Sequence, residues 1–251
     1  MTRPRVGLFA TCLVDLMRPS VGFAAAKLIE ESGCEVFVPE QTCCGQPAWN
    51  SGADAHAADL ARQTIAAFEE YDYVVVPSGS CAGMIKRHYP EALTNDADWL
   101  PRARALASKT HELTQFLVKV RGIKSVAERC AMKACYHDSC SSLREMGVKR
   151  EPRQLLESVE GLALTELAEP EQCCGFGGLF AVKYPEISER MADDKLADAE
   201  KTGADTIVSG DLGCLLHLIG RAERRGKALT GRHIAEVLAG MSDTPPLGGK
   251  P

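Results

Sequence analysis

Two copies of the tripeptide Cys-Cys-Gly, at residues 43–45 and 173–175, constrain this chain more than any other feature. Each copy lies between two further cysteines, so that eight of the 11 cysteines fall into two quartets. Corresponding members of the quartets occur in the same order and at nearly the same spacing. This repeat predicts two related halves, each with one site, whose residues are Cys12, Cys43, Cys44 and Cys81 in the first and Cys140, Cys173, Cys174 and Cys214 in the second.

Four thiolates at one place are a ligand set for zinc or for an iron–sulfur cluster. Neighbouring side chains of a strand point to opposite faces, so only a turn brings both sulfurs of a Cys-Cys pair to one centre. Gly45 and Gly175 allow such a turn because glycine adopts positive φ angles. Structural zinc sites usually use closely spaced cysteine pairs, whereas these ligands are far apart in the sequence. The pattern therefore favours an iron–sulfur cluster, with zinc as the alternative.

The composition narrows the remaining function classes. A net charge of −5 opposes general nucleic-acid binding, which requires a basic face. No apolar run is long enough to cross a bilayer, and the N-terminus lacks the pattern of a secretory signal. We therefore expect a cytoplasmic protein without a membrane span, in which thiols stay reduced. Three cysteines outside the quartets are expected to be small buried apolar residues, namely Cys34, Cys130 and Cys135.

Strands and helices alternate in both halves, and each quartet cysteine follows a predicted strand. The expected strands are residues 5–10, 35–39 and 73–77 in the first half, and 131–137, 161–167 and 206–209 in the second. The expected helices are residues 21–32, 53–70, 111–117, 185–203 and 233–238. In an open α/β sheet, ligands bind at the carboxyl ends of the strands.

The sequence thus predicts an α/β fold with two pseudo-symmetric, Rossmann-like repeats. Each repeat is expected to hold a small, mostly parallel sheet flanked by helices. The predicted domains are residues 1–125 and 126–241, followed by a disordered tail at residues 242–251 that is rich in proline and glycine.

The motifs resemble those of the CCG cysteine-rich-domain proteins, a group that includes the cysteine-rich subunit of heterodisulfide reductase. Within that group the chain is most similar to the lactate utilization protein A family. The likeness covers nearly the whole chain in the segments GLFATCLVDLMRP, PEQTCCGQPAWNSG, VVVPSGSCAGMIK, YHDSCSSLR, EQCCGFGGLFAVKYPEIS and GDLGCLLHL.

The resemblance implies one or two iron–sulfur clusters, of the [4Fe-4S] type, held by the two quartets. It implies an electron-transfer subunit, non-catalytic or co-catalytic, of an oxidoreductase complex of the L-lactate dehydrogenase type. Such a complex oxidises L-lactate to pyruvate and allows lactate to serve as a carbon source. The implied partners are a ferredoxin-like iron–sulfur subunit and a smaller third subunit. The alternatives are a thiol–disulfide redox subunit like that of heterodisulfide reductase and a non-enzymatic zinc-binding scaffold.

The chain departs from the wider motif, which ends in Cys-x-x-Cys. Met84 and His217 stand where the fifth cysteines would be. His217 is therefore a candidate further ligand, or else a helix residue beside the site. His137 and Asp138 precede Cys140 directly, and two interpretations remain open for them. They tune the second site through hydrogen bonds or proton transfer, or they are a half-buried histidine and a loop-capping aspartate.

Overall fold

Short apolar runs form the strands of a four-stranded parallel sheet in each half of the chain. The computed structural model describes residues 2–241 and 243–248, and its two sheets have the orders β2-β1-β3-β4 and β6-β5-β7-β8. The second half therefore repeats the plan of the first, which confirms the predicted α/β fold. The strands are β1 (Arg5–Leu8), β2 (Glu35–Phe37), β3 (Tyr73–Val76), β4 (Thr110–Glu112), β5 (Arg129–His137), β6 (Glu160–Thr165), β7 (Thr206–Ser209) and β8 (Thr230–His233).

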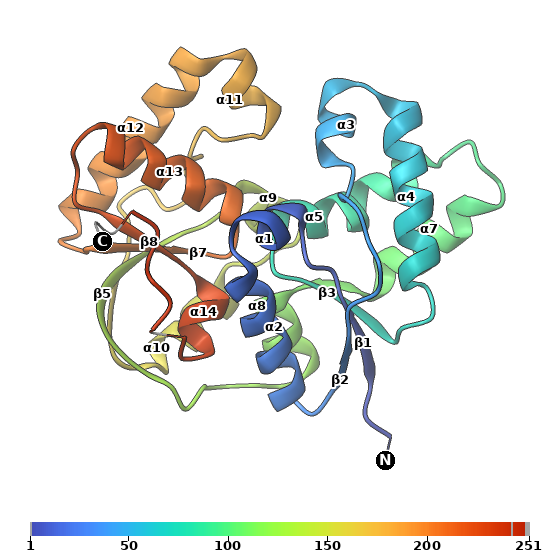
Figure 1. Ribbon diagram of the computed structural model, residues 1–251, viewed down its shortest axis with the longest axis horizontal. Helices are drawn as coiled ribbons and strands as arrows, with labels where there is room; N and C mark the ends of the chain where they lie inside the picture. The colour runs from blue at the N-terminus through green and yellow to red at the C-terminus, as the bar shows by residue number, and fades with distance from the viewer. Residues whose placement is uncertain (1, 242, 249–251) are drawn as a thin grey trace.

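Helices cover both faces of each sheet (Figure 1). Those of the first half are α1 (Cys12–Met17), α2 (Pro19–Glu31), α3 (Gln46–Ser51), α4 (Asp54–Phe68), α5 (Gly79–Gly83), the π-helical turn η1 (Met84–His88), α6 (Tyr89–Ala92), α7 (Trp99–Lys109), α8 (Leu113–Gln115) and the π-helical turn η2 (Phe116–Val120). Those of the second half are α9 (Cys140–Arg144), α10 (Arg150–Glu157), α11 (Leu179–Lys183), α12 (Pro185–Lys201), α13 (Leu212–Arg224) and α14 (Ile234–Leu238).

Alternation along the strands divides the buried residues between a central core and two outer cores. In β1, Val6 and Leu8 face the central core, whereas the next residue after the strand, Phe9, joins the outer core under α4. In β5, Tyr136 faces the central core and Cys135 faces the outer core under α12 and α13. Side chains that alternate in this way allow each sheet to be covered on both faces.

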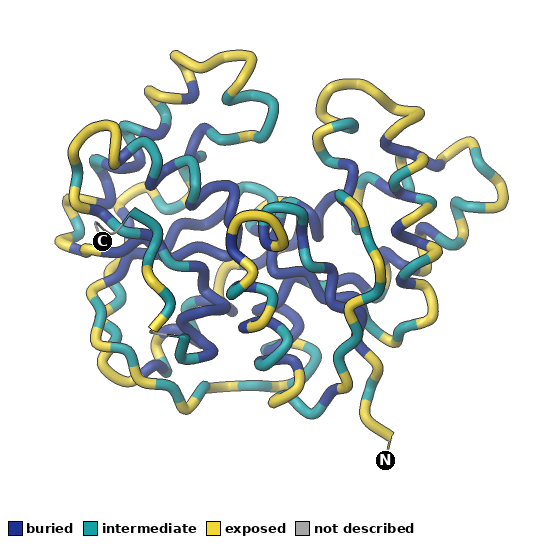
Figure 2. The backbone as a smooth tube through the Cα atoms, in the orientation of Figure 1, coloured by how far each residue is buried: buried dark blue, intermediate teal, exposed yellow. Residues whose placement is uncertain are grey.

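The central core is shared by the two halves. Helix α2 of the first half packs against α14 of the second, and α10 of the second packs against α8 of the first. Figure 2 shows the buried backbone running without interruption through this central region. The two halves therefore exchange helices across a pseudo-twofold arrangement. Where one domain ends and the next begins, near residue 125, stays a prediction.

A glycine contact joins the two halves close to their cysteines. Helix α5 packs against α9, and a Cβ atom at Gly79 would lie 1.9 Å from Ser142 Oγ and 2.6 Å from Ser142 N. Gly83, one turn later, meets the carboxylate of Glu145 in the same way. Only a residue without a side chain fits between these two backbones.

Replacing this glycine should loosen the junction. We expect Gly79→Ala to lower the free energy of unfolding by about 1–3 kcal/mol, because the added methyl group meets backbone atoms. The control is Gly22→Ala in α2, where the nearest atom would be Val14 Cγ1 at 3.4 Å. Urea unfolding followed by circular dichroism compares the two variants, and equal stabilities would contradict the close contact.

A buried ion pair joins the halves on the other side of the central core. Arg18 Nε donates to Glu236 Oε1 over 2.8 Å, and Arg18 Nη2 donates to the carbonyl of Pro245 over 2.8 Å. The side chain of Glu236 is fully buried, and that of Arg18 is 10% exposed. Ser20 Oγ and the backbone N–H of His233 also donate to the Glu236 carboxylate. The charge on Glu236 is thus compensated mainly from the first half.

Removing the cation should leave that carboxylate buried without its ionic partner. We expect Arg18→Ala to cost about 3 kcal/mol of stability, at the lower end for a broken buried pair because two other donors remain. Arg190→Ala, which removes the exposed pair with Asp194, should change stability by less than about 1 kcal/mol. Thermal unfolding of both variants in parallel tests the difference, which should vanish if the Arg18 pair contributes no more than a surface pair.

The structure corrects two expectations. Residues 111–117 and 233–238 were expected to be helices, but each of these segments begins in a short fourth strand, β4 or β8. Three or four residues are too few to show an alternating pattern, and the last residue of each strand, Glu112 or His233, caps the following helix. The predicted helices are reduced to the turns that follow.

The C-terminal tail also differs from the prediction. Leu247 forms an antiparallel bridge with Gly231 of β8, and Pro245 accepts the hydrogen bond from Arg18. Backbone hydrogen bonds to the sheet thus order residues 243–248, despite their proline and glycine content. Residues 242 and 249–251 lie outside the described residues. Among the described residues, no helix combines the length and apolar character needed to span a bilayer.

Candidate metal centres

The first quartet meets at the carboxyl ends of β1, β2 and β3. Cys12 is the first residue of α1, and Cys81 is the third residue of α5. Cys43 and Cys44 lie in the loop between β2 and α3. Cys44 Sγ is 3.3 Å from Cys81 Sγ, and Cys43 is hydrogen-bonded to both Cys12 and Cys44. All four predicted residues are therefore linked through their sulfur atoms.

The second quartet has the same arrangement. Cys140 begins α9, and Cys214 is the third residue of α13. Cys173 contacts Cys140 and Cys174, and Cys174 in turn contacts Cys214. Corresponding cysteines also have the same burial: the second cysteine of each Cys-Cys pair and the cysteine of the third loop are buried, and the other two are half-buried.

Glycine supplies the turn that each Cys-Cys pair needs, as predicted. Gly45 and Gly175 have φ angles of 87° and 86°. At Gly175 a Cβ atom would lie 2.5 Å from the carbonyl oxygen of Ser188, so the position also requires a small residue. The backbone N–H of Gly175 donates to Cys173 Sγ over 3.3 Å. Backbone donors directed at sulfur stabilise a thiolate, or a sulfur bound to a metal.

Crowding sets the charge of each quartet. Thiol hydrogen bonds from Cys12 and Cys44, with the N–H of Gly45, lower the pKa of Cys43 to about 2. The same contact with Cys43 raises the pKa of Cys12 far above its usual value, and contacts with Cys43 and Cys81 raise that of Cys44. One thiolate is thus stabilised only while its neighbours keep their protons. Four thiolates can coexist here only if metal ions supply positive charge.

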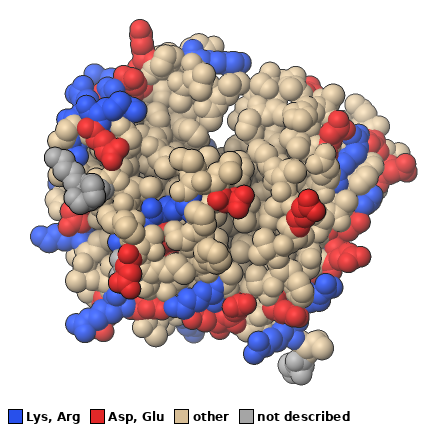
Figure 3. Space-filling view, viewed as in Figure 1, with Lys and Arg blue, Asp and Glu red and all other residues tan. Residues whose placement is uncertain are grey.

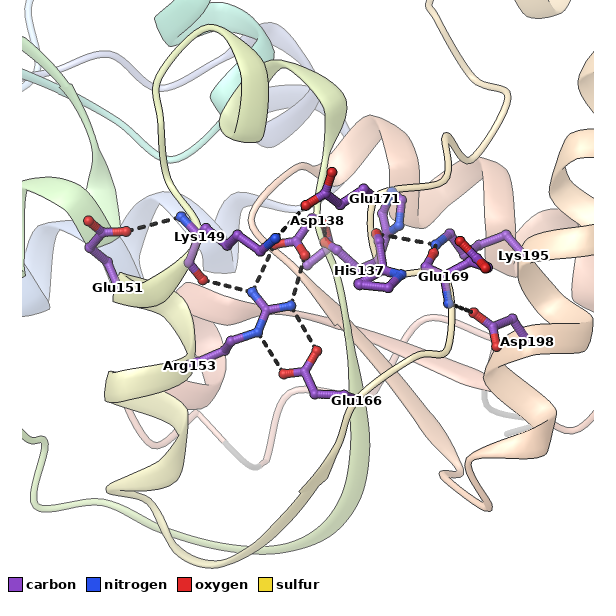
Figure 4. Close-up of polar contacts among 12 residues, drawn as sticks. His137, Asp138, Lys149, Glu151, Arg153, Glu166, Glu169, Glu171, Lys195 and Asp198 are labelled. Atoms are coloured by element: carbon purple, nitrogen blue, oxygen red, sulfur yellow. Dashed lines mark hydrogen bonds and ion pairs between the residues drawn. The ribbon is translucent and has the colours of Figure 1, made fainter.

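Polar side chains of α12 hold the second Cys-Cys-Gly loop in place (Figure 4). Lys195 Nζ donates to the carbonyls of Glu169 and Pro170, over 2.5 Å and 3.3 Å. Asp198 accepts hydrogen bonds from the backbone N–H groups of Ala168 and Glu169. Lys195 is only 1% exposed, and burial lowers its pKa. The first loop is held differently, by the hydroxyl of Tyr89, which donates to the carbonyl of Cys44 over 2.9 Å.

Asp138 is part of an ion-pair network rather than a simple loop cap. Arg153 donates to both oxygens of Asp138, at 3.0 Å and 2.8 Å, and also to Glu166 (Figure 4). Burial opposes the charge of Arg153, but the hydrogen bonds to these two carboxylates raise its pKa above the ordinary value. The network fixes the segment between β5 and Cys140.

Two histidines were considered near the second site, and the structure separates them. His217 Nε2 is 3.2 Å from Ser188 Oγ, and its ring packs against Phe176. His137 is fully buried, not half-buried, and neither of its ring nitrogens has a hydrogen-bond partner. One nitrogen of His137 lies within 4.8 Å of the sulfurs of both Cys174 and Cys214. The histidine beside the cysteines is therefore His137, whereas His217 does not belong to this group of potential ligands.

The protonation of His137 suits a ligand. Burial, helped by the charge of Lys195, lowers its pKa to about 3, so the ring is neutral at neutral pH. Neutral imidazole is the form that binds metals. Aligning the two halves at Cys12 and Cys140 would have drawn attention to this residue, because the aligned position of the first half is Phe9.

Asp211, which the sequence did not single out, connects the two sites. Its Oδ1 accepts from the N–H of Gly213 and caps α13 at the second site. Its Oδ2 accepts from Ser78 Oγ and from the N–H of Ser80, at 3.0 Å and 3.1 Å, at the start of α5 in the first site. One buried carboxylate thus caps the helices that carry Cys81 and Cys214.

A cavity of about 220 Å³ lies over the second site, between the two halves. Gln46 and Asn50 of α3 line one side, and the loop from Phe176 to Gly178 lines the other. Figure 3 shows the surface hollowed between the two lobes that carry α3 and α11. Cys140, Cys173, Cys174 and Cys214 all contribute to its wall. The second site is therefore reached through a cleft that both halves form.

The cysteines outside the quartets are consistent with apolar packing. Cys34 and Cys135 are buried in the central and outer cores, as expected, whereas Cys130 is only half-buried. Residue 130 begins the outer part of β5, where the strand extends beyond the core and loses cover.

Comparisons with known proteins agree with this geometry. The family model of the CCG cysteine-rich domain matches residues 6–86 and 134–219. Lactate utilization protein A of Geobacillus sp. (strain WCH70) is 48% identical over 235 residues, which cover 93% of this chain and 98% of the relative. The protein of the same name from Shouchella clausii (strain KSM-K16) is 49% identical over 234 residues, with the same coverage.

A solved structure of a hypothetical protein from Helicobacter pylori has a TM-score of 0.69, covering 98% of this chain and 50% of that chain. Its sequence identity of 10% limits the likeness to the fold. The curated relatives are similar over nearly their whole length, and the domain match occurs once in each half. The chain therefore belongs to the lactate utilization protein A family, with two CCG cysteine-rich domains.

Proposed function

We propose that this chain is an iron–sulfur electron-transfer subunit of a system that oxidises L-lactate to pyruvate. The observation that carries the proposal is the meeting of four cysteine sulfurs, twice, at the carboxyl edge of a parallel sheet. The link to lactate comes from the curated relatives, which are named for lactate utilization.

The spacing of the sulfurs favours a cluster over a single zinc ion. Two cysteine ligands of one tetrahedral zinc are about 3.8 Å apart, given zinc–sulfur bonds of about 2.3 Å. In both quartets, all of whose residues are described, no three sulfurs lie mutually within 4.8 Å. Sulfurs spread in this way fit a larger group with several metal atoms. The residues that would hold it are Cys12, Cys43, Cys44 and Cys81 in the first site and Cys140, Cys173, Cys174 and Cys214 in the second.

A bound iron–sulfur cluster supplies one-electron redox chemistry. The chain contributes the thiolates, the backbone donors at Gly45 and Gly175, and partial burial that restricts water. Oxidation of lactate to pyruvate releases two electrons and two protons, so two one-electron sites match its stoichiometry.

Lactate itself fits the partner proteins better than this chain. The cavity over the second site is lined by Glu145 and Asp211 as well as the cysteines, and its lining includes no lysine or arginine among the described residues. A carboxylate substrate would meet only negative or neutral groups there, which disfavours its binding. We assign substrate handling to the complex, with the ferredoxin-like protein and the smaller third subunit as partners.

The first site offers an approach for such a partner. An open groove of about 410 Å³ is lined by Cys12 and Cys43 together with Leu16 and Val38. Leu16 is 78% exposed and Val38 is 58% exposed, which is unusual for large apolar side chains. An apolar surface beside a redox site suits transient docking of an electron-transfer protein.

Metal content tests the proposal directly. Protein purified without oxygen should be brown and contain iron and acid-labile sulfide. Cys44→Ser and Cys174→Ser should each lose the iron of one site, because each removes a buried central ligand. Cys130→Ser, which alters a half-buried cysteine outside the quartets, should keep both. Zinc without iron under strict exclusion of oxygen would instead support the zinc-binding scaffold.

Lactate dependence requires a second measurement. The holoprotein mixed with its ferredoxin-like and third partners should lose visible absorbance when L-lactate is added, with formation of pyruvate. Omitting this chain, or using Cys174→Ser, should prevent electron flow to the added acceptor. Turnover at the full rate without this chain would contradict its role as an electron carrier, whatever its metal content.

A further inference from the structure

The two sites differ at one buried position. Phe9 lies three residues before Cys12, and His137 lies three residues before Cys140. Both side chains are completely buried on the outer face of their sheet. Phe9 packs against Phe68 of α4, with ring centroids 5.5 Å apart, in an apolar core that also includes Cys44 and Cys81. The repeat therefore tolerates an apolar ring here, and the second half places a polar one.

His137 has an unmet need for a partner. A buried imidazole that makes no hydrogen bond costs free energy, and buried polar groups in native proteins are nearly always paired. Neither His137 Nδ1 nor Nε2 has a partner among the described residues. The nearby ammonium group of Lys195 donates instead to the carbonyls of Glu169 and Pro170. A bound group at the second site is what remains to satisfy the ring.

The ring is directed at the cysteines. One of its nitrogens and the sulfurs of Cys174 and Cys214 lie within 4.8 Å of one another. Nitrogen and thiolate ligands bind metal ions at about 2.0–2.3 Å, so only small shifts bring this trio onto one metal atom. At the first site, where Phe9 replaces the histidine, no equivalent trio forms among the described residues.

We propose that His137 supplies a nitrogen donor to the metal cluster of the second site, which then has a mixed cysteine and histidine ligand set. The first site keeps cysteine donors alone. This inference rests on the proposed iron–sulfur function. Exchange of thiolate for imidazole raises the reduction potential of iron–sulfur centres, because a neutral ligand stabilises the reduced state. The second site is then the higher-potential member of the pair, and it lies under the cleft between the halves.

Pulsed electron paramagnetic resonance tests the assignment. Protein labelled with ¹⁵N only in histidine is reduced, and the nitrogen couplings of its clusters are recorded. We expect one of the two cluster signals to show the strong coupling of a directly bound nitrogen, changed in frequency by the label. His137→Phe should abolish the coupling and lower the midpoint potential of that cluster alone. His217→Phe should keep it, because His217 bonds to Ser188 instead.

The controls separate the possible failures. Phenylalanine is the residue that the first half accommodates at this position, and thermal unfolding checks that His137→Phe is folded. The measurement on the labelled native sequence does not depend on any variant. Two clusters without a strong nitrogen coupling, or a coupling that survives in folded His137→Phe, would overturn the histidine ligand while leaving the iron–sulfur function intact. Protein without iron would overturn both.

Discussion

The parallel pairing of β1 between β2 and β3, repeated by β5 between β6 and β7, is the constraint on which both sites depend. Parallel strands at a fixed register bring their carboxyl ends to one edge of the sheet. The three cysteine loops that follow these strands must then meet. A slip of one residue would turn every strand side chain to the opposite face and would separate the sulfurs.

The two halves use this common frame with different surroundings. The first site is embedded in apolar residues such as Phe9 and Ile65, and its Cys-Cys-Gly loop is tied by Tyr89. The second loop is tied by Lys195 and Asp198, and the approach to Cys140 is fixed by Arg153. A more polar environment with a buried cation stabilises added negative charge. Two sites of one origin are thereby given unequal electrostatic environments.

Much of the fold could be predicted from the sequence because its signals are local. Apolar runs such as residues 73–77 and the glycine of each tripeptide marked strands and turns, and the repeated cysteines marked the sheet edge. The strands β4 and β8 were missed because they are too short to show a period. The order of residues 243–248 depends on contacts with β8 and Arg18, which no local pattern reveals.

The candidate sites show the same division. All eight cysteines could be grouped by order alone, but the choice between His137 and His217 required the third dimension. His217 follows Cys214 by one helical turn, so its spacing suggested proximity, yet its ring is directed toward Ser188 and Phe176. His137 was identifiable only by its burial and its missing partners. Asp211 escaped notice because a helix cap shared between two halves has no sequence signature.

The exchange of helices across the central core has a consequence for how such a chain can arise. A single repeat would present the inner faces of its sheet and of its α2-type helix to water, with nothing of its own to cover them. Burial of that surface requires a second copy in the same twofold relation. An ancestor with one repeat would therefore be an obligate homodimer with two identical metal centres, and fusion of its genes is what freed the two positions occupied by Phe9 and His137 to diverge.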